Sequence, residues 1–289
     1  MKSARTTVTG YLFFLPFLVA FVAVRLAPFG HSIWLTFHEW EILSPPVFVG
    51  LENYATLLTT PRFWTSLRNT FYFTALTVPP LVLVGFLVAV LVNGPVLGKA
   101  LLRALFFLPN ILSISVVCIT WMLLLNNSFG FVNRVLATIG LRQVGWLTDP
   151  AVAMVSIGIT TIWWTLGFNF LIYLASLQQI PDSLYEAAQI DGAKRWHTLV
   201  FITIPMLRKT HAVVIVLQLL ASLQIFGQVY IMTAGGPAGH TRVIIQYIYE
   251  EGFRHFNMGY AQAMAIVFFL FMLGIAYLQI RLTTTVEDR

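Results

Sequence analysis

Long apolar runs, separated by short polar segments, recur along the whole chain. A helix that crosses a membrane needs about 20 mostly apolar residues. Six runs meet this requirement, and they cover residues 11–29, 70–92, 104–125, 151–177, 210–232 and 259–280. The pattern predicts six membrane-spanning helices, and therefore an all-α integral membrane protein.

The composition excludes a soluble globular enzyme. Of the 289 residues, 58% are hydrophobic and 10% are charged, whereas a soluble domain has roughly 25% charged residues. The mean hydropathy is +0.82. Because the apolar excess is spread along the whole chain, we expect a single polytopic membrane domain. The one cysteine, Cys118, permits neither an intrachain disulfide nor a cysteine-based metal site.

The basic residues predict how the chain crosses the membrane. Cytoplasmic loops of membrane proteins carry an excess of Lys and Arg. If the N-terminus is cytoplasmic, every lysine falls on the cytoplasmic side: Lys2, Lys99, Lys194 and Lys209. Six spans then place both termini in the cytoplasm. The net charge of +6 is explained by this asymmetry, so no nucleic-acid partner is predicted.

The first run, residues 11–29, has two interpretations. Lys2 and Arg5 precede it, as basic residues precede the apolar core of a cleaved signal peptide. The length of the run, the presence of Arg25 and the lack of a small-x-small cleavage site favour an uncleaved first span. Arg25 is the only charged residue within the six predicted spans. It lies near an outer end, where its long side chain is expected to reach the interface.

The chain has no recognisable means of driving transport by itself. Carriers coupled to protons or sodium ions usually place carboxylates within the membrane, but none of the 11 Asp and Glu residues lies in a predicted span. Residues 94–99 resemble a phosphate-binding loop, yet they are one residue short, and Ala100 stands where the magnesium ligand should be. The histidines lack zinc-protease spacing. These observations disfavour both a secondary transporter and a membrane enzyme.

A polar segment between the fourth and fifth runs carries the most informative local signal. Ser183 and Glu186 have capping-box spacing behind Pro181, which predicts a short helix over about residues 184–190. Gly192 should end this helix, because glycine readily adopts the left-handed conformation that reverses a chain. A second helix should follow and lead to the fifth span.

The surface of this short helix suits contact with another protein. Ala187 and Ala188 are small enough to let a partner approach closely. Glu186 offers a carboxylate to an Arg or Lys of that partner. A loop that merely connects two spans is the alternative.

The order of these residues resembles a known motif. Glu186-Ala187-Ala188, with Gly192 four residues after the second alanine and a final Pro205, is similar to the E-A-A loop of the permease subunits of binding-protein-dependent ABC importers. Other segments resemble the branch of this family that contains the maltose-type and glycerol-3-phosphate-type first permease subunits: residues 50–54, 103–109, 146–150 and 230–237. The family usually has Leu before the final proline, where this chain has Ile204.

The resemblance implies a fold and an assembly. The fold is that of type I ABC importer permeases, in which the first of six transmembrane helices is added to a five-helix core. The implied divisions are a tail, first helix and first extracytoplasmic loop at 1–66, a core at 67–282 with its coupling loop at about 179–209, and a cytoplasmic tail at 283–289. The implied partners are a second homologous permease subunit, an ATPase subunit dimer and an extracytoplasmic solute-binding protein.

By the same resemblance, the contact with the ATPase is assigned to four residues of the loop: Glu186, Ala187, Ala188 and Gly192. Pro205 is expected to shape the return of the chain to the membrane. ATP and magnesium belong to the ATPase subunits, so this chain is expected to hold no cofactor and to catalyse nothing.

Solute contacts are expected from polar and aromatic side chains on the spans next to this loop, because sugar sites combine aromatic faces with amide hydrogen bonds. The candidates are Trp163, Trp164, Asn169, Gln224, Gln228 and Tyr230. Gln224 and Gln228 are four residues apart and should share one helix face. Hydrogen bonding between helices is the alternative role for each candidate.

Together these features predict a permease subunit in the bilayer of a prokaryotic cytoplasmic membrane. The expected solute is a carbohydrate, either a disaccharide, an oligosaccharide or a related polyol compound. A passive channel or facilitator that works without an ATPase is the second interpretation. A membrane enzyme is the third, and it would require an ordered set of titratable residues within the spans.

Overall fold

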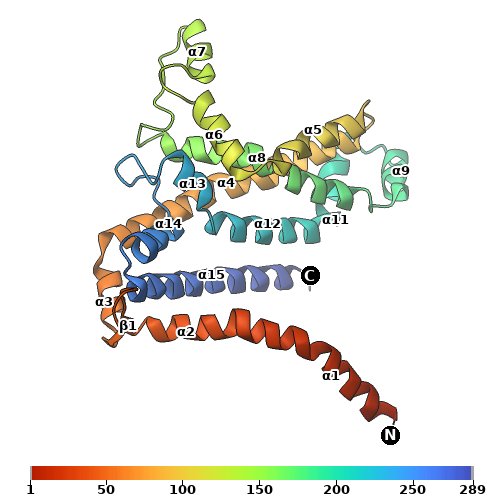
Figure 1. The fold of residues 1–289 in the computed structure, drawn as a ribbon. Helices are drawn as coiled ribbons and strands as arrows, with labels where there is room; N and C mark the ends of the chain where they lie inside the picture. Colours follow the sequence, from red (N-terminus) through yellow and green to blue (C-terminus); the bar gives the residue numbers. More distant parts are fainter. Residues whose placement is uncertain (1, 288–289) are drawn as a thin grey trace. The chain divides into compact units, whose positions relative to one another are not determined.

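The computed structural model describes residues 2–287, which are mostly helical (Figure 1). Two long helices, α4 (Pro61–Asn93) and α15 (Met258–Glu287), each contribute to two compact units. The first unit consists of the chain up to Phe63 together with Tyr247–Phe271, and the second of Trp64–Gln246 together with the chain from Met272 onward.

The first unit begins with a long apolar helix, made of α1 (Lys2–Phe21), the π-helical turn η1 (Val22–Leu26) and α2 (Ala27–Leu35). A small hairpin follows, made of β1 (His38–Glu39) and β2 (Val47–Phe48), and then α3 (Glu52–Thr59). The unit closes with the last turn of α14 (Ile244–Tyr249), the π-helical turn η3 (Glu250–Arg254) and the first half of α15.

Arg25 lies near the middle of the first long helix. The stretch that could cross a membrane extends over Phe13–Leu35, beyond the predicted run of residues 11–29. The residues that follow the predicted run remain helical as far as Leu35, and the His31 ring stacks on Trp34 with centroids 5.5 Å apart. The prediction that Arg25 lies near an outer end of its span is therefore wrong. Its side chain is exposed within η1.

The two-residue strands depart from the all-α prediction. They pair antiparallel, with His38 opposite Phe48. Asn53 of α3 holds the backbone that leads into them, because its amide nitrogen donates to the carbonyl oxygens of Thr36 at 2.9 Å and of His38 at 3.0 Å. By binding these two carbonyl groups, the Asn53 side chain stabilises non-helical backbone after α2. Hydropathy alone does not indicate that the helix ends there.

The second unit is built around α8 (Ala153–Leu177). Before it come α4, α5 (Lys99–Ile111), α6 (Ile114–Leu124) and α7 (Phe131–Thr138). After it come α9 (Asp182–Ile190), α10 (Arg195–Thr198), the π-helical turn η2 (Leu199–Thr203), α11 (Ile204–Met206), α12 (Arg208–Leu223), α13 (Gly227–Met232) and the first turn of α14.

Close packing of α8 against its neighbours fixes this unit. Phe170 and Tyr173 of α8 are fully buried and pack with Phe86 of α4 in one apolar cluster. On another side, α8 meets α5 so closely that a methyl group at Gly167 would overlap the backbone at Phe106. Glycine is therefore required where these two helices cross.

Within the described residues, four helices are long and apolar enough to cross a membrane by themselves: Phe13–Leu35, Pro61–Asn93, Ala153–Leu177 and Met258–Gln279. Two further candidates are pairs joined at a bend: Lys99–Ile111 with Ile114–Leu124 at 97°, and Arg195–Met206 with Arg208–Leu223 at 66°. Counting each bent pair as one crossing gives the predicted six. The third predicted span is thus a broken helix rather than a continuous one.

Candidate functional site

The loop between α8 and α12 contains the predicted short helix. α9 begins at Asp182, and the residue before it, Pro181, is extended (φ −61°, ψ 132°). Ser183 already lies inside the helix and no side chain caps its start, so the predicted capping box of Ser183 and Glu186 is wrong. Pro181 instead sets the entry through its fixed φ. Asp182 places a negative charge at the positive end of the helix dipole.

Gly192 ends α9 as predicted. Its φ of +75° is left-handed, a conformation that glycine adopts without strain. The Gly192 amide donates to the Gln189 carbonyl at 3.0 Å, and the Ala193 amide donates to the Ala188 carbonyl at 2.8 Å. These two bonds form a Schellman motif, which satisfies carbonyl groups that the last helical turn would otherwise leave open.

The outer side of the loop offers both charge and apolar surface. Glu186 and Ala187 are exposed, whereas Ala188 is 8% exposed and is buried against the chain itself. Trp196 and Phe201, which follow in α10 and η2, are 69% and 71% exposed. Large exposed side chains beside a carboxylate favour a surface that another protein covers.

Pro205 lies just before the 66° bend that leads into α12. It is the middle residue of α11, and Leu207 separates α11 from α12, where the helix direction changes by 66°. The loop is attached to α9 through Thr203 of η2, whose hydroxyl lies 3.2 Å from the Tyr185 hydroxyl. That Pro205 shapes the return of the chain stays a prediction.

The sharp corner between α5 and α6 leaves backbone groups that need hydrogen-bond partners. Leu112 and Ser113 are both extended, with ψ of 144° and 148°. The Ser113 hydroxyl accepts from the Val116 amide at 3.5 Å and so caps α6. The Trp164 indole of α8 donates to the Leu112 carbonyl at 3.2 Å. Trp164, a predicted solute contact, therefore lies at this corner.

A second break separates Gln224 from Gln228. α12 ends at Leu223, and α13 begins only at Gly227. The prediction that the two glutamines share one helix face is therefore wrong. A side chain at Gly227 would overlap Ile114, so α13 begins directly against the first turn of α6. The second break consequently lies beside the α5–α6 corner.

Aromatic side chains gather around the two breaks. Trp163 of α8 packs edge-to-face on Trp121 of α6, with centroids 5.7 Å apart. Tyr230 of α13 stacks on Phe226 within the second break, at 5.2 Å. Of the predicted solute contacts, Trp164 therefore lies at the α5–α6 corner and Trp163 against α6, whereas Gln224, Gln228 and Tyr230 lie at or just after the second break.

Asn169 is held differently from the other candidates. It is fully buried, and its Oδ1 accepts a hydrogen bond from Gln218 Nε2 of α12 at 2.8 Å. This is the contact between helices that the sequence offered as the alternative role. Contact of Asn169 with a solute stays a prediction, and its burial disfavours it.

Ser113, Trp121 and Phe226 were not among the residues predicted from the sequence. Ser113 had a usable signal, since a serine shortly after Pro109 can begin a new helix. Trp121 and Phe226 had none, because each lies in an apolar run and is distinguished only by its place beside a break.

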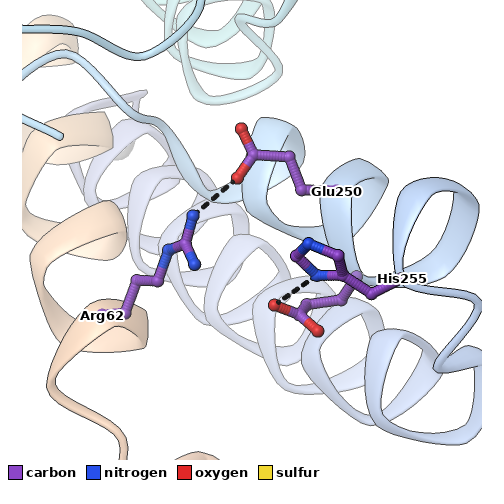
Figure 2. Close-up of polar contacts among 4 residues, drawn as sticks. Arg62, Glu250 and His255 are labelled. Carbon is purple, nitrogen blue, oxygen red and sulfur yellow. Dashed lines mark hydrogen bonds and ion pairs between the residues drawn. The ribbon is translucent and has the colours of Figure 1, made fainter.

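A polar cluster in the first unit joins segments that are distant in sequence (Figure 2). Arg62 Nη2 donates to Glu250 Oε2 at 3.0 Å, and the guanidinium carbon lies 5.0 Å from the centroid of the Tyr247 ring. His255 Nδ1 lies 3.2 Å from Glu251 Oε1. Burial raises the pKa of Tyr247, so its ring remains neutral beneath the Arg62 cation. No local pattern in the sequence indicates this cluster.

Replacing Arg62 with Met should destabilise the first unit. The Glu250 side chain is 7% exposed, and removing one partner of a buried ion pair costs about 3–5 kcal/mol. Because the Arg62 side chain is 42% exposed, water screens the pair, and we expect a loss of about 1–2 kcal/mol, measured as a lower Tm in nanodiscs. His255→Gln is the control, because its more exposed pair contributes about 1 kcal/mol or less. A loss that is no larger for Arg62→Met than for His255→Gln would contradict this account.

Several apolar helices, broken helices within one unit and an exposed helix-turn-helix loop are features expected of a membrane permease. The chain belongs to the family of binding-protein-dependent transport system inner membrane components, whose family model matches residues 55–286. It is therefore a membrane subunit of an ABC importer, in which the ATPase is a separate subunit, and it is not an enzyme. The predicted family is confirmed.

Relatives and solved structures are similar over nearly the full length. The chain is 32% identical over 283 residues to the probable ABC transporter permease protein YurN of Bacillus subtilis (strain 168), covering 96% of this chain and 97% of that protein. It is 33% identical over 270 residues to the trehalose/maltose transport system permease protein MalF of Thermococcus litoralis, covering 93% and 90%. A bacterial alginate ABC transporter, in complex with alginate pentasaccharide-bound periplasmic protein, matches with a TM-score of 0.87 at 25% identity, over 99% of this chain and 97% of that chain. The predicted permease fold is confirmed.

Proposed function

We propose that this permease subunit moves a carbohydrate across a prokaryotic cytoplasmic membrane. The solute class is a disaccharide, an oligosaccharide or a related polyol compound. The α9 loop carries the proposal of ATP-driven transport, because an exposed helix with a fixed end is suited to transmit the motion of a separate ATPase dimer. The trehalose/maltose and alginate transport of the similar proteins supports a carbohydrate as the solute.

The coupling contact is assigned to the outer side of the α9 loop. Glu186 offers its exposed carboxylate to an Arg or Lys of the ATPase, and Ala187 lets that surface approach. Gly192 fixes where the helix ends. Ala188 acts from the inner side, where its burial holds α9 against the chain. Pro205, just before the bend into α12, conveys the displacement toward the fifth span.

The solute path is assigned to two places where helices are interrupted: the α5–α6 corner and the break between α12 and α13. Irregular backbone at membrane depth is tolerated where it is buried in protein or lines a cavity, and transporter sites often use such discontinuous helices. Trp163 and Tyr230 offer ring faces to the C–H groups of a sugar. Gln224, which is exposed, and Gln228 offer amides to its hydroxyl groups, and Trp164 holds the corner beside them.

The rest of the assembly follows from the same proposal. Both termini and the α9 loop face the cytoplasm, since that orientation collects the lysines there. A second homologous permease subunit and an extracytoplasmic solute-binding protein complete the importer. Residues 1–66 are peripheral to a transport core at 67–282. In the proposed tail at 283–289, α15 continues to Glu287, and residues 288–289 lie outside the described residues.

Affinity purification of the tagged chain from its native membrane tests this assembly. We expect an ATPase, a second permease and a binding protein to be recovered with it. Glu186→Lys should lose the ATPase and retain the second permease, because it reverses the charge at the coupling contact. Glu186→Gln, which keeps the shape, is the matched control and should retain more ATPase.

The outcomes separate the competing functions. A binding protein that takes no carbohydrate would contradict the solute class. A chain that is recovered alone and that mediates ATP-independent flux in liposomes would be a passive facilitator. Full ATPase recovery with Glu186→Lys would remove Glu186 from the coupling contact.

A further inference from the structure

α7 presents an apolar stripe that the rest of the second unit leaves uncovered. The stripe consists of Phe131, Val135 and Ile139, whose exposed fractions are 66%, 42% and 65%. Ile139 is the residue that caps the C-terminal end of α7. Residues four apart lie on one side of a helix, so these three side chains form one line. Phe129 and Leu141, 54% and 56% exposed, extend the apolar surface at its two ends.

The opposite side of α7 is fixed to the chain. Asn133 is 2% exposed. Its Oδ1 accepts from the Val144 amide at 3.1 Å and from the Trp146 indole at 3.0 Å, while its Nδ2 donates to the Val144 carbonyl at 3.0 Å. Because these bonds hold the helix by its inner side, the apolar stripe has a defined outward direction.

Positive charge flanks the stripe. Arg134 and Arg142 are exposed, and within residues 2–287 neither guanidinium group makes a hydrogen bond or an ion pair. The nearest acidic residues in the sequence are Glu52 on one side and Asp149 on the other. A line of apolar side chains beside unneutralised arginines is typical of a helix that lies on an anionic membrane surface.

We propose that α7 lies in the headgroup interface of the bilayer. Phe131, Val135 and Ile139 insert toward the acyl chains, and Arg134 and Arg142 contact the phosphates of anionic phospholipids. Charge complementarity supports this partner. Continuity with the membrane supports it further, because α6, one half of a candidate span, ends at Leu124 and only a short turn precedes α7 (Figure 1).

This anchor has a mechanical consequence for the second unit. α6 begins at the corner with α5 and leads at its other end to α7. An interfacial α7 therefore holds that end of α6 at a constant depth in the bilayer. The proposal concerns lipid contact and does not depend on which solute is carried.

Site-directed spin labelling of the full importer in nanodiscs tests whether the apolar stripe inserts toward the acyl chains. Nitroxides are attached at Phe131→Cys, Val135→Cys and Ile139→Cys, with Arg134→Cys and Thr138→Cys as matched positions on the flank of the same helix. The native Cys118 is fully buried, and the unsubstituted chain reports any label that it takes up. Collision with oxygen, relative to a water-soluble nickel chelate, should be several-fold greater at the three stripe positions.

Two outcomes would overturn the interfacial position. Equal collision ratios at all five positions would mean that α7 stands in water. Stripe labels that are immobilised and shielded from both reagents would mean that a partner protein covers α7.

The contact of Arg134 and Arg142 with anionic headgroups is tested in vesicles of phosphatidylcholine, with and without phosphatidylglycerol. The label at Val135→Cys should move deeper when phosphatidylglycerol is added, because anionic headgroups attract the two arginines. The same label combined with Arg134→Gln and Arg142→Gln should show no such shift. A depth that is independent of phosphatidylglycerol with both arginines present would exclude the headgroup contact.

Discussion

Replacing Gly192 with Val should strongly impair transport while the chain still inserts in the membrane. At a φ of +75°, a residue with a Cβ is strained by roughly 1–2 kcal/mol. No described atom lies within 4 Å of a Cβ built at Gly192, so the strain comes from the backbone alone. We expect the bonds that end α9 to open and the docking equilibrium to weaken by about tenfold, since about 1.4 kcal/mol corresponds to that factor. Transport and ATP hydrolysis stimulated by the binding protein are the measurements.

Gly192→Asn is the matched control for this prediction. Asparagine tolerates the left-handed conformation far better than valine, and it adds a side chain of similar bulk. It should therefore retain most of the transport activity. If both variants lost transport activity equally, the cause would be the size of the new side chain at the coupling contact and not the backbone conformation. Normal transport in Gly192→Val would remove Gly192 from the coupling assignment.

Gly167→Ala should prevent α5 from packing correctly on α8. A Cβ built at Gly167 lies 2.8 Å from the Phe107 Cα and closer still to the Phe106 carbonyl oxygen. Because these are backbone atoms, no rotation of a side chain relieves the overlap. We expect a destabilisation of about 3 kcal/mol or more, measured by thermal unfolding of the purified chain.

A glycine elsewhere in the fold provides the control for Gly167→Ala. Gly274 lies within α15 and has no described atom within 4 Å of a built Cβ. Gly274→Ala should therefore be neutral or stabilising by up to about 1 kcal/mol, because alanine restricts the unfolded chain. Shifts of Tm in the same direction and of the same size would contradict the packing argument for Gly167.

The features that could be predicted from the sequence are those that depend on a short segment of chain. The length of the apolar runs identified a helical membrane protein, because crossing a bilayer is decided by the content of about 20 residues. The helix expected over residues 184–190 forms as Asp182–Ile190 and ends at Gly192. Both the helix and its glycine end are local properties of the chain.

The breaks within spans could not be predicted in the same way. An average of hydropathy is unchanged when the chain bends, so the corner at Leu112 and Ser113 left no mark on the apolar pattern. The corner also depends on Trp164, which lies on another helix and donates to the Leu112 carbonyl. Gln224 and Gln228 were placed on one face for the same reason, since their spacing is helical but the helix between them is interrupted.

Contacts between distant segments were also beyond prediction. The Arg62–Glu250 pair joins residues 188 positions apart, and each residue alone looks like an ordinary charge in a loop. Arg25 was misplaced because the predicted run ended at residue 29, whereas the helix continues to Leu35.

The division of the first unit between two distant parts of the sequence bears on how the protein is made. The segment before Phe63 leaves the ribosome well ahead of Tyr247–Phe271, with which it packs. At usual rates of synthesis the delay is roughly 10–40 s, during which Phe13–Leu35 lacks the later half of its own unit. The Arg62–Glu250 bond closes only once nearly the whole chain has been inserted. A nascent chain that stops before Tyr247 therefore lacks the segment that completes the first unit around its hairpin and α3.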